Sequence, residues 1–430
     1  MANSKWKKEP LKKLCYRIGD GLHGTPKYSD NTDIFFINGN NLKNGKIVIT
    51  ENTNTVSKEE LENNYIALNE NTLLLSINGT LGSMAFYNNE TVMLGKSAAY
   101  LNFKTNINRF YYYYFQLDGV QQYFHNVATG STIKNLSLKS IQDFEVPVPD
   151  DKEWQSIVSI LSSLDSKIEL NNKINSELEK IAKTIYDYWF VQLDFPDANG
   201  KPYKSSGGKI VFNDELKREI PLGWEIGSLL DIATYTNGIA CQKYRPDSYD
   251  YLPVIKIREM RDGITVNTEK VKVDIPEKVK VFDGDVLFSW SASLEVMQWS
   301  GGDGGLNQHI FKVTSKKYPK SFYFFELVNY LHHFKMVADL RKTTMGHITR
   351  DHLKQSRIII PPKELIKALD EKLNPILNKQ VLLNKENQKL TELRDWLLPM
   401  LMNGQVTVKE AQEQINQAAE PQENYSINSK

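Results

Sequence analysis

The chain has 430 residues, with 53 Lys and Arg against 52 Asp and Glu and a formal net charge of +1. Its length predicts two or three domains, and 40% apolar with 24% charged residues is typical of a folded globular protein. This composition excludes a strongly basic DNA-coating protein, a membrane protein with apolar spans of about 18 residues, and a disulfide-stabilised secreted domain. We expect Cys15 and Cys241 to be reduced thiols in a cytoplasmic protein.

The chain repeats one pattern at an offset of roughly 210–220 residues. Residues 72–77 match 285–290, and each segment is a buried-strand pattern followed by a short polar loop. The other matches keep the same order along the chain: 36–38 with 254–256, 44–47 with 262–264, the aromatic runs 110–115 with 322–325, 130–133 with 345–348, and 144–147 with 358–361. We therefore predict an internal duplication with a pseudo-twofold axis. The aromatic runs are predicted to pack in the cores.

Each repeat is followed by a predicted long helix. Apolar residues recur at alternating steps of three and four through 157–188 and again through 369–400. This is the narrow seam of a coiled coil, so we predict helices over 151–193 and 363–404, each about 50–60 Å long, that pack as an antiparallel pair. Two independent surface helices are the alternative. The following amides fall in the seam and are expected to fix its register: Gln380 and Asn387.

The predicted fold class is α+β, with two globular domains separated by the two antiparallel helices. The connection is rich in Gly, Pro, Ser and Lys and includes a possible small hairpin, whereas the C-terminal tail is polar and is expected to fray or to form a short amphipathic helix. The boundaries are: domain 1, 1–150; central helix, 151–193; linker, 194–223; domain 2, 224–362; distal helix, 363–404; flexible polar tail, 405–430.

No motif in the sequence indicates catalysis. The chain has no Walker A loop and no Asn/Asp-Pro-Pro-aromatic motif of an adenine methyltransferase. Residues 301–305 are glycine-rich but are predicted to be a hairpin turn that leads into a strand over 306–310. Asp150–Lys152 is typical of a capped helix start. We predict no catalytic residue, no metal site and no cofactor on this chain.

Polar and basic loops recur at matching places in the two halves and are the candidate DNA-binding residues. Asn and Gln can read adenine edges, Arg and Lys can read guanine, and Ser and Thr can hold phosphates. For any single residue, an ordinary turn role is the alternative. The first half supplies Asn40, Lys43, Lys46, Asn78, Thr80, Lys96, Ser131, Thr132 and Lys134. The second half supplies Lys256, Arg258, Arg261, Ser291, Asn307, Gln308, Arg341, Lys342, Thr344, His347, Thr349 and Arg350.

Several segments together resemble the specificity (S) subunits of type I restriction–modification systems, the HsdS family. The resemblance spans about residues 5–408. Residues 221–225 with 229–233 resemble the entry to a target-recognition domain of that family, and 130–136 with 146–149 resemble its exit. The central conserved region is matched by 171–190 with 194–196, and the distal one by 390–405.

The resemblance implies two target-recognition domains that read a bipartite, asymmetric site in double-stranded DNA, with the coiled coil setting the gap. It also implies two methylation subunits that carry S-adenosylmethionine and methylate adenine, and restriction subunits in the full complex. The chain itself would be a non-catalytic specificity subunit. The alternatives are a specificity chain of a methylation-only system and a protein-binding coiled-coil scaffold. A stand-alone methyltransferase is opposed by the missing motif.

Overall fold

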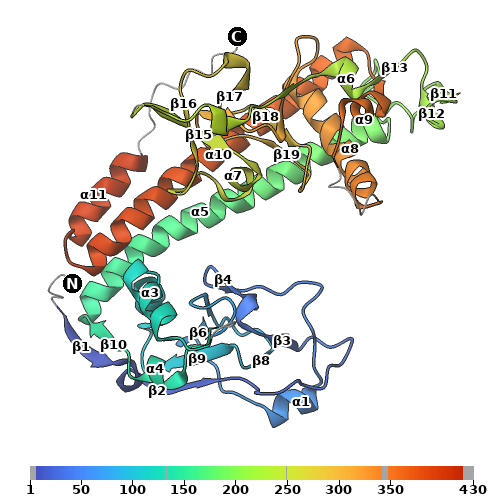
Figure 1. Ribbon diagram of the computed structural model, residues 1–430. Coiled ribbons are helices and arrows are strands. Elements are labelled where there is room, and N and C mark those ends of the chain that lie inside the picture. The colour runs from blue at the N-terminus through green and yellow to red at the C-terminus, as the bar shows by residue number, and fades with distance from the viewer. Residues whose placement is uncertain (1–5, 131–133, 248, 341–346, 420–430) are drawn as a thin grey trace. The chain divides into compact units, whose positions relative to one another are not determined.

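The computed structural model describes residues 6–130, 134–247, 249–340 and 347–419. The chain forms two compact units, each assembled from distant parts of the sequence. Unit 1 comprises Met1–Ser166 and Leu390–Lys430, and unit 2 comprises Lys167–Lys389. The two long helices, α5 (Asp151–Tyr186) and α10 (Lys363–Met402), each contribute one part to each unit (Figure 1).

Unit 1 is built on a four-stranded antiparallel sheet in the order β2-β9-β6-β7. Every residue of its two central strands is buried, so this sheet lies in the core of the unit. A parallel pair, β3–β8, and an antiparallel pair, β1–β10, complete the main framework. The strands are β1 (Lys7–Pro10), β2 (Cys15–Asp20), β3 (Phe35–Ile37), β4 (Leu42–Lys43), β5 (Lys46–Ile47), β6 (Thr72–Ser76), β7 (Met84–Phe86), β8 (Val92–Leu94), β9 (Ala98–Phe103) and β10 (Glu145–Val148). The helices are η1 (Leu11–Lys13), η2 (Gly39–Asn41), α1 (Lys58–Asn63), α2 (Asn108–Tyr114), α3 (Asp118–Val127), α4 (Leu138–Gln142) and α11 (Val408–Ala419).

Unit 2 contains the corresponding sheet in the order β14-β21-β18-β19 and a second four-stranded sheet in the order β16-β15-β20-β17. The linker forms the hairpin β11–β12 that the sequence allowed. The strands are β11 (Ile210–Asn213), β12 (Arg218–Pro221), β13 (Glu225–Ser228), β14 (Thr234–Asn237), β15 (Tyr251–Ile255), β16 (Lys270–Lys272), β17 (Lys280–Val281), β18 (Val286–Ser289), β19 (Glu295–Gln298), β20 (Gly304–Leu306), β21 (Ile310–Thr314) and β22 (Arg357–Ile360). The helices are η3 (Asp187–Val191), α6 (Leu229–Ile232), η4 (Cys241–Lys243), α7 (Ile257–Asp262), η5 (Glu277–Val279), α8 (Lys320–Leu340) and α9 (Arg350–Gln355).

The predicted α+β duplication is confirmed by the topology. The order β2-β9-β6-β7 in unit 1 matches β14-β21-β18-β19 in unit 2, and the parallel pair β3–β8 matches β15–β20. The pair β1–β10 matches β13–β22, and each long helix begins directly after the second strand of its pair. The same set of elements therefore precedes both helices.

In two of the repeat matches, the sequence pairs residues that are not structurally equivalent. The N–H of Leu136 donates to the Ile77 carbonyl as the N–H of Ile348 donates to the Trp290 carbonyl, so Ile348 is equivalent to Leu136 and not to Ile133. Likewise, because β10 and β22 hold equivalent places before the two helices, Pro361 corresponds to Pro149. Short polar loops of unequal length carry too little sequence similarity to fix their own alignment.

The glycine-rich segment after β19 differs from its prediction. Residues 301–305 do not close a hairpin, because β19 pairs with β18 whereas β20 pairs with β15 and β17. Gly304 and Gly305 belong to β20, and the predicted strand over 306–310 is interrupted by a turn at Asn307–His309. The segment is a crossover between two sheets, and sequence periodicity does not reveal which sheet a strand joins.

The antiparallel packing of the two long helices is confirmed within each unit. In unit 1, Arg394 Nη1 lies 3.0 Å from Asp165 Oδ1. In unit 2, the buried Asn171 donates to Glu386 Oε2 and Asn387 Oδ1 at 2.9 and 3.0 Å, and Asn175 donates to Asn384 Oδ1 at 2.6 Å. Contacts thus move toward lower residue numbers on α10 as they move toward higher numbers on α5. The predicted seam amides also bridge the helices, because Asn387 donates to Asn172 Oδ1 and Gln380 donates to the Asn175 carbonyl.

The amide pair Asn171–Asn387 predicts a coupled effect on stability. Asn171→Leu should lower the free energy of unfolding by about 1 kcal/mol, because Asn387 Oδ1 loses its donor at a partly buried position between the helices. Asn171→Leu/Asn387→Leu should be more stable than either single variant, because an apolar pair then replaces both polar groups. Chemical denaturation of the four species tests this, with Lys173→Leu at an exposed α5 position as the control. A double variant whose loss equals the sum of the single losses contradicts the prediction.

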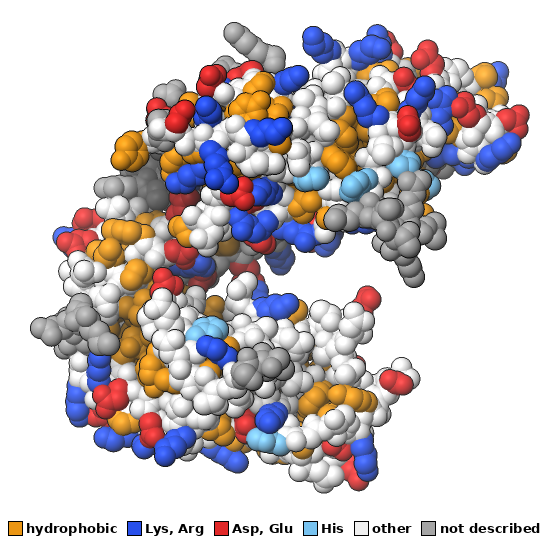
Figure 2. All heavy atoms as spheres, in the orientation of Figure 1, with side chains coloured by type: hydrophobic (Ala, Val, Ile, Leu, Met, Phe, Trp, Pro, Cys, Tyr) orange, Lys and Arg blue, Asp and Glu red, His pale blue; other side chains and the backbone are white. Residues whose placement is uncertain are grey.

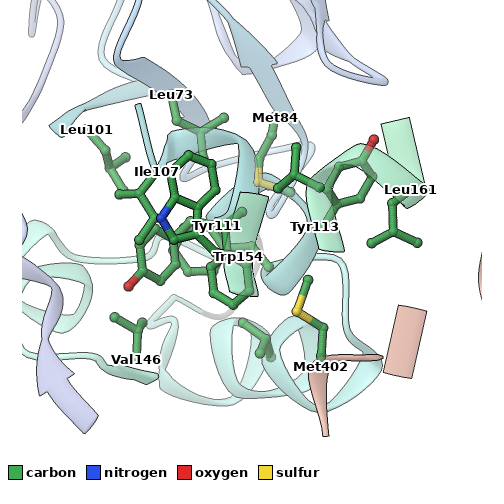
Figure 3. Packing of buried hydrophobic residues seen from close by; sticks show 14 of the residues in the cluster. Leu73, Met84, Leu101, Ile107, Tyr111, Tyr113, Val146, Trp154, Leu161 and Met402 are labelled. Carbon is green, nitrogen blue, oxygen red and sulfur yellow. The ribbon is translucent and has the colours of Figure 1, made fainter. Parts of the chain in front are cut away.

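The aromatic runs lie in the cores, as predicted. In unit 1, Phe110, Tyr111 and Tyr113 are buried with strand residues, and Trp154 from α5 and Met402 from α10 join the same cluster (Figure 3). In unit 2, the buried residues of the second run pack with the C-terminal turns of α5 and the N-terminal turns of α10. They are Phe322, Tyr323 and Phe325. These clusters explain why the helices pack tightly where they meet each domain.

Other features agree with the sequence in the described ranges. Asp150 caps α5 by accepting a hydrogen bond from the Glu153 N–H at 2.9 Å. Both cysteines are buried and free. The tail contributes α11, whose Ala411 is buried in the unit 1 cluster. None of the described helices is both long and apolar enough to cross a membrane.

Candidate nucleic-acid interface

Four loops of unit 1 meet at one end of its central sheet. The Ser97 hydroxyl donates to Asn38 Oδ1 and accepts from the Gly39 N–H, both at 2.9 Å, which joins the loop after β3 to the turn between β8 and β9. The Ile77 N–H donates to the Ser97 carbonyl, which adds the turn after β6. Leu136 N–H donates to the Ile77 carbonyl, which adds the segment before α4. We call these four loops the unit 1 reading loops.

The structure brings most of the candidate residues of unit 1 to these loops. Asn40 is exposed on η2, and Lys96 is exposed on the β8–β9 turn. Thr80 is exposed on the β6–β7 turn, next to the half-buried Asn78, which forms a β-bridge with Asn135. Lys134 precedes that bridge and is exposed. Ser131 and Thr132 lie outside the described residues.

Two basic residues of unit 1 lie on a hairpin, and a third lies near the end of a helix. Lys43 and Lys46 are paired across the β4–β5 hairpin, which contacts β7 through the N–H and C=O groups of Gly45. Lys134 Nζ donates to the His125 carbonyl at 2.8 Å, close to the C-terminus of α3. This cation complements the negative end of the helix dipole, so it has a structural role besides any contact with DNA.

Unit 2 has the same backbone network at the equivalent place. The Trp290 N–H donates to the His309 carbonyl as Ile77 donates to Ser97, and the Ile348 N–H donates to the Trp290 carbonyl. The Asn307 N–H donates to the Ile255 carbonyl as Gly95 donates to Ile37. These bonds join the loops after β15, β18 and β20 to the segment before α9. We call them the unit 2 reading loops.

The candidate residues of unit 2 divide into three groups. Gln308 is half-buried, and the exposed residues His347 and Thr349 precede α9, whose first residue is the exposed Arg350. Ser291 and Asn307 are buried, so that they support their turns and do not present side chains to a ligand in this conformation. The third group, Lys256, Arg258 and Arg261, lies at or on α7. Arg341, Lys342 and Thr344 lie outside the described residues.

Each basic residue of the α7 group is paired with a carboxylate of the same unit. Lys256 Nζ contacts Glu269 Oε1 at 2.5 Å, and this hydrogen bond holds the pKa of Glu269 below its usual value. Arg261 Nε contacts Glu295 Oε1 at 2.6 Å. Arg258 Nη2 lies 2.6 Å from the buried Glu259, whose hydrogen bond and charge raise the pKa of the guanidinium. These cations are therefore already balanced before any phosphate arrives.

Two residues of this interface are not among the candidates that the sequence indicates. Trp290 lies among the unit 2 reading loops, and its Nε1 donates to Asn237 Oδ1 at 2.9 Å. Trp290 is the last apolar residue of the predicted strand 285–290, so the sequence indicates a strand residue at this position. Asn237 lies outside the repeat matches. The signal that was available is the match of Trp290 to an aliphatic residue, Ile77, at the edge of a polar loop.

The surface is electrostatically mixed. On the face in Figure 2, Lys and Arg side chains alternate with Asp and Glu, in keeping with the small net charge. Within the described ranges, no three His, Cys, Asp or Glu side chains lie together in a group that could hold a metal ion. What the described parts of these loops offer is hydrogen-bonding amides and hydroxyls, exposed cations and, in unit 2, the indole ring of Trp290.

Comparison with known proteins identifies this arrangement. A family model described as type I restriction modification DNA specificity domain matches the chain twice, over residues 3–180 and 221–392. The chain belongs to the family of type I restriction–modification specificity subunits. Each match covers one repeat and most of the long helix that follows it. The units therefore carry the two target-recognition domains, and the family resemblance inferred from the sequence is confirmed.

Individual relatives agree with this assignment. The type I restriction enzyme MjaIX specificity subunit of Methanocaldococcus jannaschii is 26% identical over 319 residues, which are 71% of this chain and 70% of that protein. The HindI specificity subunit of Haemophilus influenzae is 24% identical over 343 residues, 66% of this chain and 74% of that protein. The crystal structure of the type I S subunit from M. genitalium covers 93% of this chain and 96% of its own, with a TM-score of 0.58 and 14% identity, and shows the common fold.

Proposed function

We propose that this chain is the DNA-reading subunit of a type I restriction–modification enzyme and that it recognises a bipartite, asymmetric site. The observation that supports this best is the pair of reading-loop networks. Their backbone hydrogen bonds are equivalent, whereas the side chains at equivalent positions differ, such as Ile77 against Trp290 and Ser97 against His309. Two readers of the same design with different side chains fit two half-sites of different sequence. The coiled coil between them would set the gap.

We further propose that the chemistry belongs to partners. Two methylation subunits would bring S-adenosylmethionine, bind along this chain and methylate one adenine in each half-site. Such enzymes extrude the target base from the duplex before they act on it. Restriction subunits would join through this complex. The chain would then need no cofactor, and its partners would share the phosphate contacts that its balanced charge does not supply.

Long-read mapping of N6-methyladenine tests this function. Cells that carry the gene with its methylation subunit should show a two-part motif with a fixed gap, and the motif should vanish when this gene alone is deleted. A palindromic motif would contradict asymmetric reading. Unchanged methylation in cells that express the chain would favour a protein-binding scaffold, which a pull-down for partners would then examine. A motif without restriction of unmethylated phage would indicate a methylation-only system.

The paired cations on α7 give a separate prediction for DNA affinity. Glu295→Gln should strengthen binding of the assembled complex about two- to fivefold, because Arg261 becomes available to a phosphate. The slope of log affinity against log salt should steepen by about 0.9, the value for one added contact with B-DNA. Fluorescence anisotropy at several salt concentrations measures both quantities. Asp247→Asn is the control, because it makes the same charge change at the Lys272–Asp247 pair. Lys272 pairs with the first residue of β15, at the end of this strand away from α7, so the slope should not change. Equal slopes for all three proteins would show that Arg261 does not face DNA.

A further inference from the structure

The indole of Trp290 is fixed in place at the centre of the unit 2 reading loops. Its backbone is held by the His309 carbonyl and the Ile348 N–H, and its ring nitrogen donates to Asn237. The His309 and His347 rings flank it at centroid distances of 5.5 and 5.3 Å, and the Phe311 ring lies 5.9 Å away. The ring is half-buried, whereas the equivalent Ile77 of unit 1 is 2% exposed.

The turn after Trp290 is also held in a defined conformation. The Ser289 hydroxyl accepts from the Glu295 N–H at 2.9 Å and donates to the Ser293 carbonyl. Ala292 has φ +56°, a left-handed conformation that costs an L-residue energy, and the equivalent residue of unit 1 is Gly79 with φ +75°. A turn that keeps alanine in this region is over-determined by its surroundings, which is common at functional positions.

The contacts of Trp290 limit how it can recognise DNA. An indole has one hydrogen-bond donor and no acceptor, and Asn237 already occupies that donor. The remaining surface is apolar, so the ring cannot distinguish bases by hydrogen bonding. In the major groove the only apolar group that marks a base is the C5-methyl of thymine. An immobilised aromatic ring among DNA-reading loops suits that group.

We propose that Trp290 reads a thymine methyl group in the half-site bound by unit 2. The inference rests on the proposed function, because it takes the reading loops to face the major groove. The described reading loops of unit 1 have no indole at this place, since the equivalent Ile77 is buried and these loops present Asn40, Thr80 and Lys96. The two half-sites therefore differ in the kind of contact that specifies them as well as in sequence.

Uracil scanning of the DNA tests the proposal. The complex of this chain with its methylation subunits and S-adenosylmethionine is bound to duplexes that carry the mapped motif. Each thymine, on either strand, is replaced singly by uracil, which removes only the methyl group. Cross-linking with 5-bromouracil duplexes assigns each half-site to its unit. We expect one uracil in the half-site of unit 2 to weaken binding about three- to tenfold, and no uracil in the other half-site to have an effect of that size.

Substitutions connect that methyl group to the indole. Trp290→Ala should weaken binding to thymine DNA by a similar factor and should bind thymine and uracil duplexes equally. Trp290→Phe keeps an apolar ring and should retain part of the discrimination, which provides a second variant if the alanine protein does not fold. Tyr249→Ala removes a fully exposed aromatic ring near the opposite end of β15 and should discriminate like the unmodified chain.

Two results would overturn the proposal while the proposed function stands: uracil duplexes that all bind normally, or full discrimination by a folded Trp290→Ala complex. Failure of the assembled complex to bind the mapped motif at all would instead refute the proposed function.

Discussion

Replacing Trp154 by alanine should lower the free energy of unfolding of unit 1 by about 3–5 kcal/mol, the range for removing a large buried aromatic side chain. Trp154 is 4% exposed and lies on the first turn of α5, where its Nε1 donates to Asp151 Oδ1 at 3.1 Å. The indole packs in the same cluster as Tyr111, Leu161 and Met402 (Figure 3). Its removal leaves a cavity where domain 1 and both long helices meet.

The other helix of unit 1 offers a matched control. Trp396 lies on α10 but is 45% exposed, so Trp396→Ala makes the same chemical change without opening a core cavity. Its cost should stay below about 1 kcal/mol. Denaturation followed by circular dichroism compares the two variants with the unmodified chain. Similar losses at both positions would mean that burial in the unit 1 core does not determine the effect.

Stability of unit 2 should fall as the pH rises from about 4.5 to about 7, and Glu326→Gln should abolish this part of the pH dependence. Burial raises the pKa of Glu326 to about 7, although the hydrogen bond from Tyr186 and the charge of Arg218 both act to lower it. The unfolded chain releases this proton near pH 4.5, so the folded state holds one more proton between these pH values. The contribution to stability is therefore complete below pH 4.5 and is lost as the pH rises through 7.

The expected size follows from the shift in pKa. A difference of about 2.5 units corresponds to roughly 3 kcal/mol, and because Glu326 is only half-buried by accessible surface we expect about 2–3 kcal/mol. Glutamine keeps an acceptor for the Tyr186 hydroxyl and cannot ionise, so Glu326→Gln should exceed the unmodified chain by that amount at pH 8 and match it at pH 4.5.

Urea denaturation at pH 4.5, 6 and 8 measures this difference. Glu371→Gln, at an exposed position of α10, should follow the unmodified chain at every pH. Tyr186→Phe should raise the pKa of Glu326 further and steepen the dependence above pH 6, because the carboxylate loses its donor. Parallel curves for Glu326→Gln and the unmodified chain would show that this carboxyl has the same pKa in the folded and unfolded states.

Much of the architecture was predictable because it is repeated along the chain. The match of 72–77 with 285–290 is a core-strand match, and the structure places both segments at the centre of equivalent sheets. The seam periodicity located α5 and α10, and the amides Gln380 and Asn387 do bridge them. Apolar periodicity is a local property that burial imposes on the sequence, so it can be read without a structure.

The reading loops were less predictable. The sequence match between the two halves is displaced where their loops differ in length, as at Leu136 and Ile348. The sequence predicts a strand over 306–310 where the chain turns at Asn307–His309, since a short apolar–polar alternation does not distinguish a strand from a turn between strands in different sheets. No local pattern indicates that Arg261 is paired with Glu295, 34 residues further along the chain.

The sequence by itself determined that the chain is duplicated, that each half ends in a coiled-coil helix, and which family it resembles. These features appear as periodicities and motifs formed by residues that are close together in the sequence. Only the tertiary structure decided which polar residues meet, that the α7 cations are already neutralised, and that Trp290 is fixed among the reading loops with its donor used. Those facts depend on long-range hydrogen bonds and ion pairs whose partners are set by sheet order and loop length, which hydrophobic patterning leaves open.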